Sequence, residues 1–342
     1  MNAYLADILA QPSAMRAALD GFDQKLLRDV TRRLSDGRLD RVVITGMGTS
    51  LFGSYPAWQS LAEHGVAAWC IESAELLHSV TRLITPKTLL WVVSQSGRSA
   101  EIVALLESAS RAAFVLASTN DPASPAAKKA HAWISMRAGQ EHTVATKTYV
   151  NTLIINRLVA LSLVGGNLDA ERKQAAAAAA AAEVYLQDWE AHTRRLEGQI
   201  ADGNRLIIVG RGISLASAET AGLILKEAAK VTAQGLSAAQ FRHGPLELAD
   251  STLTVLVFEG EERSAHLNRK LVEELQGYGA RAFLITGKDP SGLPCIPCPA
   301  GEGIGMPIAD VLPIQMLSFP LASRNGFEPG VFRHSGKVTT NE

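Results

Sequence analysis

Thr88-Leu-Leu-Trp-Val-Val93 runs directly into Ser94-Gln-Ser-Gly-Arg-Ser99 and then into Ala100-Glu-Ile-Val-Ala104. The apolar run is typical of a buried parallel strand, and the segment rich in Ala, Glu and Ile is typical of a helix. A helix start offers unpaired N–H groups and the positive end of the helix dipole, which together favour an anion. We therefore interpret residues 94–99, with their three hydroxyls and Gly97, as a phosphate-binding loop. An ordinary serine-rich helix cap is the alternative that this stretch alone leaves open.

Composition sets the general class. The chain has 342 residues, of which 47% are apolar and 20% charged, as expected for a soluble globular protein with one large or two ordinary domains. Its formal net charge is −1 and it has no basic tract, so we expect neither a nucleic-acid partner nor a membrane surface. We find no signal-peptide pattern and no run of apolar residues long enough to span a bilayer. We therefore expect a cytoplasmic protein.

Three cysteines, Cys70, Cys295 and Cys298, give a weak metal or redox signal. The last two form a single Cys-Ile-Pro-Cys motif without a second pair or nearby histidines. We expect ordinary reduced thiols and no metal site.

Strand and helix patterns alternate around the 94–99 loop. This alternation predicts a mainly parallel α/β sheet with helices on both faces. We expect helices over residues 4–10, about 13–35 and 147–164. Strands are predicted at residues 41–46, 67–71, 88–93, 113–118 and 132–136.

The second half of the chain repeats the first. Arg205-Leu-Ile-Ile-Val-Gly210-Arg-Gly-Ile-Ser214 echoes Arg41-Val-Val-Ile-Thr-Gly46-Met-Gly-Thr-Ser50 at an offset of 210 − 46 = 164 residues. Further strands are predicted at residues 253–258 and 280–286, with a last helix near 308–322. The repeat predicts two lobes of the same architecture.

The alanine-rich segment between the lobes reads as a helix, because eight consecutive alanines at 175–182 strongly favour that conformation.

The glycines of the repeat also invite a dinucleotide-binding interpretation, with Glu72 as the ribose-binding acid. However, Gly46, Gly48 and Gly53 lack the G-x-G-x-x-G spacing, so a nicotinamide enzyme is only a minor alternative and we expect no cofactor.

Four motifs in order give the chain a family resemblance. They are Gly46-Met-Gly-Thr-Ser50, Ser94-Gln-Ser-Gly97, Val144-Ala-Thr-Lys147 and the pair Leu225-Lys-Glu227 with Arg242-His-Gly-Pro-Leu246. Together they resemble the double sugar isomerase (SIS) domain, and most of all the isomerase portion of glucosamine-6-phosphate synthase and its stand-alone amino-sugar-phosphate relatives. The glutamine-hydrolysing domain of the synthase has no counterpart here, so glutamine-fed synthesis is not expected.

The resemblance implies a fold of two tandem SIS lobes. Each lobe would be a mainly parallel sheet flanked by helices, a three-layer flavodoxin-like sandwich. We expect N-terminal helices and the first lobe over residues 1–165, the alanine-rich connecting helix over 166–200 and the second lobe over 201–325. A C-terminal tail, residues 326–342, would contribute to the active site.

The same resemblance implies three catalytic side chains. Glu227 would carry a proton between adjacent sugar carbons, which a carboxylate can do without leaving its place. His243 would open the sugar ring and, as in the synthase, reach the site of a neighbouring subunit, which implies a homodimer with shared active sites. Lys337 would form an imine or stabilise a developing oxyanion. A surface Lys-Glu pair, a structural turn and a loose charged tail are the respective alternatives.

The implied substrate-binding residues surround the two turns and a third segment. They are Thr49, Ser50, Ser94, Gln95, Ser96, Ser99 and the backbone of Val144, with Gly48 and Arg98 as further candidates. Arg98 stands where the synthase has glutamate, and the Val144–Lys147 segment is one residue shorter than its counterpart. Both departures leave the identity of the sugar open.

We therefore expect an enzyme that isomerises and deaminates an amino-sugar 6-phosphate. A deglycase of a phosphorylated sugar–amine conjugate would need the same chemistry. The non-enzyme alternative is a phosphosugar-binding regulator, although neither a DNA-binding helix pair nor a partner domain is evident in the sequence.

Overall fold

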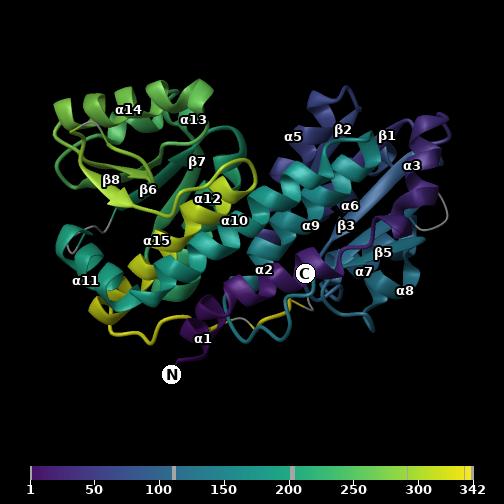
Figure 1. The fold of residues 1–342 in the computed structure, drawn as a ribbon, viewed down its shortest axis with the longest axis horizontal. Coiled ribbons are helices and arrows are strands. Elements are labelled where there is room, and N and C mark those ends of the chain that lie inside the picture. The colour runs from purple at the N-terminus through teal and green to yellow at the C-terminus, as the bar shows by residue number, and fades with distance from the viewer. Residues whose placement is uncertain (1, 110–112, 201–204, 291, 335, 340–342) are drawn as a thin grey trace. The chain divides into compact units, whose positions relative to one another are not determined.

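The computed structural model describes residues 2–109, 113–200, 205–290, 292–334 and 336–339. They form two compact units, each with its own parallel sheet (Figure 1). The first unit comprises residues 13–141, 146–175 and 334–342, and the second unit comprises residues 1–12, 142–145 and 176–333.

The sheet of the first unit has five parallel strands in the order β2-β1-β3-β4-β5. All five predicted strands are confirmed, two of them displaced by one residue. Long apolar runs form the central strands, and β3 is buried along its whole length. The strands are β1 (Arg41–Gly46), β2 (Ala68–Glu72), β3 (Thr88–Val93), β4 (Phe114–Thr119) and β5 (Ala132–Ser135).

Helices cover both faces of this sheet. One face packs against α6, α7 and α8 through a single apolar cluster, and α9 is the predicted helix over residues 147–164. The helical segments are α2 (Gln11–Gly21), η1 (Gln24–Leu27), α3 (Arg28–Ser35), α4 (Thr49–Phe52), α5 (Tyr55–Glu63), α6 (Ser73–His78), η2 (Thr81–Leu83), α7 (Ala100–Ala109), α8 (Pro125–Lys129) and α9 (Lys147–Val164).

The prediction of one helix over residues 13–35 is wrong. The chain leaves the helix after Gly21, whose missing side chain makes room for Arg137: a Cβ on Gly21 would lie 1.9 Å from Arg137 Nε. Asp23 then accepts a hydrogen bond from the backbone N–H of Lys25 at 2.9 Å and starts a new turn. Local capping therefore outweighs the general helical pattern here.

The second unit repeats the topology of the first. Its strand order, β7-β6-β8-β9-β10, matches β2-β1-β3-β4-β5, and the pair Leu206–Ala233 corresponds in register to Val42–Ala68. The predicted duplication is confirmed, whereas β7 and β10 were not predicted. The strands are β6 (Arg205–Gly210), β7 (Ala233–Ser237), β8 (Leu253–Phe258), β9 (Arg281–Thr286) and β10 (Cys295–Pro297).

The second sheet also has helices on both faces, α13 and α14 on one and α12 and α15 on the other (Figure 1). Helix α12 approaches β7 so closely that a Cβ on Gly222 would lie 2.5 Å from the backbone N of Gly235. The helical segments are α1 (Ala3–Leu9), α10 (Leu168–Gln187), α11 (Trp189–Ile200), η3 (Gly212–Ser214), α12 (Leu215–Ala229), α13 (Ala238–Phe241), η4 (Pro245–Leu248), α14 (Glu262–Gly277) and α15 (Gly305–Arg324).

The alanine-rich segment is helical as predicted, but it forms two helices instead of one. Helix α10 ends at Gln187 and α11 begins at Trp189. The side chain of Tyr185, near the end of α10, stacks on His192 of α11 with ring centroids 3.9 Å apart.

Helix α15 is the central helix of the second unit. By length and hydropathy it could cross a membrane, but 83% of its most apolar window is buried within the protein, which is typical of a core helix. Asp310 lies in this buried stretch, and among the described residues its Oδ2 has no hydrogen-bond partner. Burial raises the pKa of Asp310 to about 8.

The N-terminal helix packs on α15. The ring of Tyr4 stacks on Phe319 at 5.6 Å, and Gln11 and Gln315 exchange side-chain hydrogen bonds of 2.8 and 3.1 Å. Asn2 caps α1 and also donates to Glu328 at 2.8 Å. The first twelve residues therefore belong to the core of the second unit.

Candidate functional site

The predicted phosphate-binding loop connects β3 to α7. The Oγ atom of buried Ser94 accepts a hydrogen bond from the N–H of Gly97 at 3.0 Å, and Ser96 Oγ accepts one from the N–H of Arg98 at 3.2 Å. The carbonyl of Gln95 accepts from the N–H of Asn120 at 3.0 Å. Ser99 directly precedes the first residue of α7. The serines therefore fold the loop into a fixed turn at a helix start.

Gly97 is required in this turn by a neighbouring part of the protein. Its φ is +61°, and a Cβ there would lie 2.4 Å from Ser124 Oγ. Ser124 caps the N-terminus of α8. The space left by the missing side chain of Gly97 is thus filled by the Ser124 side chain.

Arg98 is engaged by Asp121. Its guanidinium donates to Asp121 Oδ2 at 2.6 and 3.0 Å, and this hydrogen bonding lowers the pKa of Asp121. The side chain of Arg98 is 46% exposed. The expected extra cation beside the loop is thus paired with a carboxylate of its own unit.

The turn after β1 lies at the same edge of the sheet. Strands β1 and β3 pair in parallel, with Thr45 opposite Val92, and a Cβ on Gly46 would lie 2.7 Å from the carbonyl O of Val93. Gly48 has a φ of +51° and precedes α4, which begins with the half-buried Thr49 and Ser50. Because chain order reverses between these two strands, their carboxyl ends form the usual ligand crevice of an open α/β sheet.

The tail that carries Lys337 lies against this edge of the first unit. The carbonyl of Thr339 accepts a hydrogen bond of 3.2 Å from the N–H of Ala100, the first residue of α7. Lys337 Nζ forms an ion pair with Glu141. The structure therefore brings Lys337 together with the start of the helix that follows the 94–99 loop.

Glu141 is a site residue that sequence analysis missed. Its side chain is fully buried, whereas that of Lys337 is 23% exposed. One carboxylate oxygen accepts the N–H groups of Thr146 and Thr148 at 2.8 and 3.0 Å, and the other accepts the Thr148 hydroxyl at 2.6 Å as well as Lys337 Nζ. Glu141 is therefore held in place by donors of its own segment before Lys337 binds it. The only signal for Glu141 in the sequence was its position, three residues before Val144, where a predicted site segment begins.

Val144 belongs to the second unit, together with the rest of residues 142–145. It is 1% exposed. The preceding His142 donates its N–H to Asp7 Oδ2 at 2.8 Å, and its ring lies 3.3 Å from Asp7 Oδ1. The backbone around Val144 is thus fixed by α1.

Glu227 and His243 also lie in the second unit. Glu227 is half-buried in the last turn of α12. His243 is exposed in the turn between α13 and η4, where its N–H donates to the carbonyl of Gln240 at 3.0 Å. Strand β7 and helix α13 separate the two residues along the chain.

The corresponding edge of the second sheet is built differently. The residue after β8, at the position of Ser94 after β3, is the buried Glu259, which pairs with Arg269 and accepts from the Thr286 hydroxyl. The carboxylate of Glu261 fills the space beside Gly212, where a Cβ would lie 2.1 Å from its Oε2. Glu261 in turn pairs with Arg263 at 3.0 Å, so arginines compensate both carboxylates at this edge.

The described residues hold no group of three or more His, Cys, Asp or Glu side chains that could bind a metal ion. Cys70, Cys295 and Cys298 are free cysteines. Burial raises the pKa of Cys70 to about 12, so its thiol is unreactive at neutral pH.

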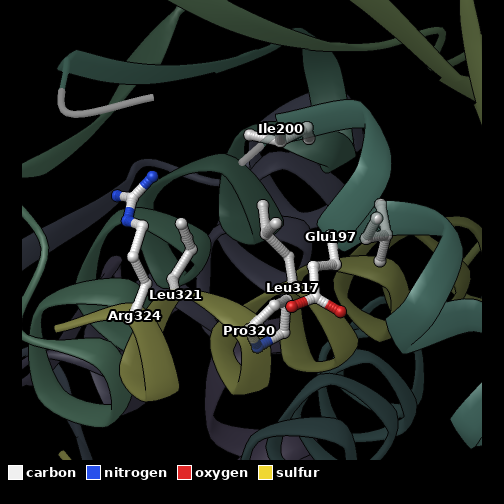
Figure 2. Close-up of a pocket in the computed structure, with 7 residues that line it drawn as sticks. Glu197, Ile200, Leu317, Pro320, Leu321 and Arg324 are labelled. Atoms are coloured by element: carbon white, nitrogen blue, oxygen red, sulfur yellow. The ribbon is translucent and has the colours of Figure 1, made fainter. Parts of the chain in front are cut away.

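A hollow of about 250 Å³ in the second unit lies apart from all of the predicted site residues of that unit. Figure 2 shows its mostly apolar lining, with Glu197 at one side and Arg324 at the other. It lies between α11 and the end of α15, and the residues that line it are Leu196, Glu197, Ile200, Leu317, Pro320, Leu321 and Arg324.

The fold and the loop at the edge of the first sheet define the class of protein. A model of the SIS domain family matches residues 38–162 and 199–321, and the chain belongs to that family. Among curated proteins it is 28% identical over 353 residues to glutamine–fructose-6-phosphate aminotransferase (isomerizing) of Thermococcus kodakarensis. The match covers 99% of this chain and 58% of that protein, so the chain spans little more than half the length of this relative.

Two solved structures have a similar fold. The C-terminal domain of glucosamine-fructose-6-phosphate aminotransferase from Francisella tularensis gives a TM-score of 0.85 at 19% identity, covering 96% of this chain and 98% of that one. Glucosamine-6-phosphate deaminase from Thermotoga maritima gives 0.75 at 15% identity, covering 98% and 99%. At these identities the likeness concerns the fold.

Proposed function

We propose that this chain is a phosphosugar isomerase that converts an amino-sugar 6-phosphate into a ketose phosphate and ammonia. One observation supports the proposal most directly. A serine-rich loop at a helix start, suited to a phosphate, lies in the same unit as a tail that fixes Lys337 beside that helix. Two similar proteins, an isomerizing glutamine–fructose-6-phosphate aminotransferase and a glucosamine-6-phosphate deaminase, are named for related sugar phosphates, which is consistent with such a substrate.

The proposed reaction assigns one task to each of three side chains. His243 transfers the proton that opens the sugar ring to the free aldehyde. Glu227 removes the proton from C2 and returns it to C1, while a second proton passes from the amine nitrogen to O1; together these transfers convert the C2 amine into an imine and the aldehyde into an alcohol. Water then adds to the C2 imine, and ammonia leaves to give the C2 ketone.

Lys337 acts in this scheme as an ammonium ion. An amine in an ion pair with a buried carboxylate carries a proton on nitrogen and has no lone pair with which to form an imine. An ammonium can instead stabilise the oxyanion that develops while the proton moves from C2. The Glu141 pair thus favours the electrostatic role over the covalent one.

A shared site in a homodimer is part of the proposal. His243 is exposed, and the helical turn η4 that follows it ends in Leu248, an apolar side chain with 46% of its surface accessible. An exposed histidine followed in the chain by an exposed leucine can contribute to a neighbouring subunit.

The test is an ammonia-release screen over glucosamine, galactosamine and fructosamine 6-phosphates, followed by exchange of the C2 hydrogen in deuterated water. We expect release from an amino-sugar 6-phosphate and exchange with the same substrate. Glu227→Gln should lower both rates at least about a hundredfold while phosphosugar binding survives.

Two other outcomes would replace this reaction. Release of a free amine from fructosamine 6-phosphates alone would identify a deglycase. Tight phosphosugar binding without C2 exchange for any sugar would identify a regulator instead of an enzyme.

A further inference from the structure

Helix α12, which carries Glu227, ends in an unusual way. Its last residue is followed by Lys230 in the left-handed conformation, with φ 56° and ψ 36°. Arg137 is the only other non-glycine residue with positive φ in the part of the chain that the structure describes. A side chain costs about 1 kcal/mol or more in this conformation, which is why glycine is the usual choice at such a position. The chain keeps a lysine where glycine would be less strained.

The Lys230 ammonium connects two segments. It donates to the carbonyl of Glu227 and, at 2.7 Å, to the carbonyl of Val331, which lies at the base of the C-terminal tail. The ammonium therefore lies beside the turn of α12 that presents Glu227.

Helix capping does not explain the lysine. The carbonyls of Ala228 and Ala229 accept from Gly330 N and Asn325 Nδ2, both at 3.2 Å, and the carbonyl of Lys226 accepts the backbone N–H of residue 230. These bonds come from other residues or from the main chain. A glycine at position 230 would keep these three bonds and would remove the donation from Lys230 Nζ to the carbonyl of Glu227.

Three charges meet at this helix end. Burial lowers the pKa of Lys230, the nearby Glu227 carboxylate opposes that shift and the Arg333 guanidinium adds to it. Arg333 itself lies over the ring of Phe327, at 4.9 Å. Lys226, one turn before Lys230 on α12, is exposed. The half-buried ammonium of Lys230 is thus a cation in hydrogen-bond contact with the backbone carbonyl of Glu227.

We propose that Lys230 is a positioning residue for Glu227, which fixes the last turn of α12 against the base of the tail and keeps the Glu227 carboxylate ionised. This inference rests on the proposed function, in which that carboxylate removes the C2 proton. A carboxylate beside a cation stays ionised to lower pH and can act as a base over a wider range. The strained backbone at residue 230 is then the cost of placing an ammonium there.

The test compares Lys230→Gly, Lys230→Gln and Lys230→Arg. Glycine relieves the backbone and removes the charge, glutamine keeps hydrogen-bond donors without charge, and arginine keeps the charge. In the glycine and glutamine variants we expect the acid limb of the C2-exchange rate to move up by about 0.5–1 pH unit, because loss of a nearby cation raises the pKa of a carboxylate. Arginine should restore the wild-type acid limb.

A second measurement separates this inference from the proposed reaction. The pKa of Glu227 can be followed by carbon NMR of labelled glutamate, with Glu227→Gln used to assign the signal. We expect it to rise in Lys230→Gly even if no exchange substrate has been found. An unchanged Glu227 pKa in both neutral variants would overturn the role of Lys230, whereas a shifted pKa without any C2 exchange would refute the proposed function alone.

Discussion

Replacing Glu141 by glutamine tests whether one ion pair fixes the tail that carries Lys337. The amide oxygen of glutamine can still accept the N–H groups of Thr146 and Thr148, which lie 2.8 and 3.0 Å from Glu141 Oε1. Its NH₂ group can donate to the Thr148 hydroxyl, which is able to accept as well as donate. Lys337 Nζ is a donor only and would face another donor. The substitution therefore removes the Glu141–Lys337 ion pair with little other change.

The size of the effect follows from burial. A hydrogen bond to a charged group contributes about 1.5–3 kcal/mol. Glu141 is fully buried but the side chain of Lys337 is 23% exposed, so we expect the lower part of that range, about 1.5–2 kcal/mol. Release of the tail should then become about 10- to 30-fold more frequent.

Hydrogen exchange at Ala100 measures this release. Its N–H is the first of α7 and donates to the carbonyl of Thr339, so it exchanges when the tail leaves. We expect about 10- to 30-fold faster exchange in Glu141→Gln and in Lys337→Met, without a further increase in the double variant.

Glu107→Gln is the matched control, because Glu107 pairs with Lys129 at 3.3 Å on the surface of the same unit. Exposed pairs of this kind contribute about 0–1 kcal/mol, so Ala100 exchange should stay near the wild-type rate. Unchanged Ala100 exchange in Glu141→Gln, or fully additive effects in the double variant, would show that the ion pair does not hold the tail.

Four further predictions concern the loop, the core and the assembly. Ser96→Ala should weaken phosphosugar binding by about 1–3 kcal/mol, and equal affinity in calorimetry would remove residues 94–99 from the site. Gly97→Ala should lower the free energy of unfolding in urea by about 2–4 kcal/mol because of its positive φ and the nearby Ser124, whereas Gly65→Ala, with positive φ but open space, should cost about 1 kcal/mol. The pKa of Asp310 is about 8 in the folded protein against an ordinary 3.8, so the folded state retains a proton that the unfolded state releases, and stability should fall as pH rises from about 4 to 8. Asp310→Asn should abolish that fall, which amounts to about 3 kcal/mol between pH 5 and 8, and an unchanged pH dependence would contradict it. Mixing an excess of a Glu227→Gln, Lys337→Ala double variant with His243→Ala should restore some activity through hybrid dimers, and no recovery despite confirmed subunit exchange would rule out a shared site.

The sequence predicted the central strands and the loops between them because their signals are local. Long apolar runs mark β1, β3, β6 and β8, with glycine or serine at the end of the first three, and the repeat of Gly46 and Gly48 at Gly210 and Gly212 marks the duplication. The structure confirms both lobes. The roles of the site residues remain predictions.

The features that were missed depend on distant partners. Strand β7 (Ala233–Ser237) contains Gln and Gly, and β10 (Cys295–Pro297) has three residues, so both gain their strand pairing from neighbours instead of from an apolar pattern. Glu141 and Lys230 resemble surface residues in the sequence. Each also has one partner in a distant segment, Lys337 for Glu141 and Val331 for Lys230, 196 and 101 residues away, which no local pattern reveals.

The place of α1 in the second unit affects the order in which the chain folds during synthesis. Residues 13–175 supply nearly all of the first unit and can fold while the rest is still being made. Helix α1 has seven residues and is too short to be stable alone, yet Phe319 and Ser318, its partners on α15, are made about 300 residues later. At about 5–20 residues per second, α1 waits roughly 15–60 s on the ribosome without its binding surface.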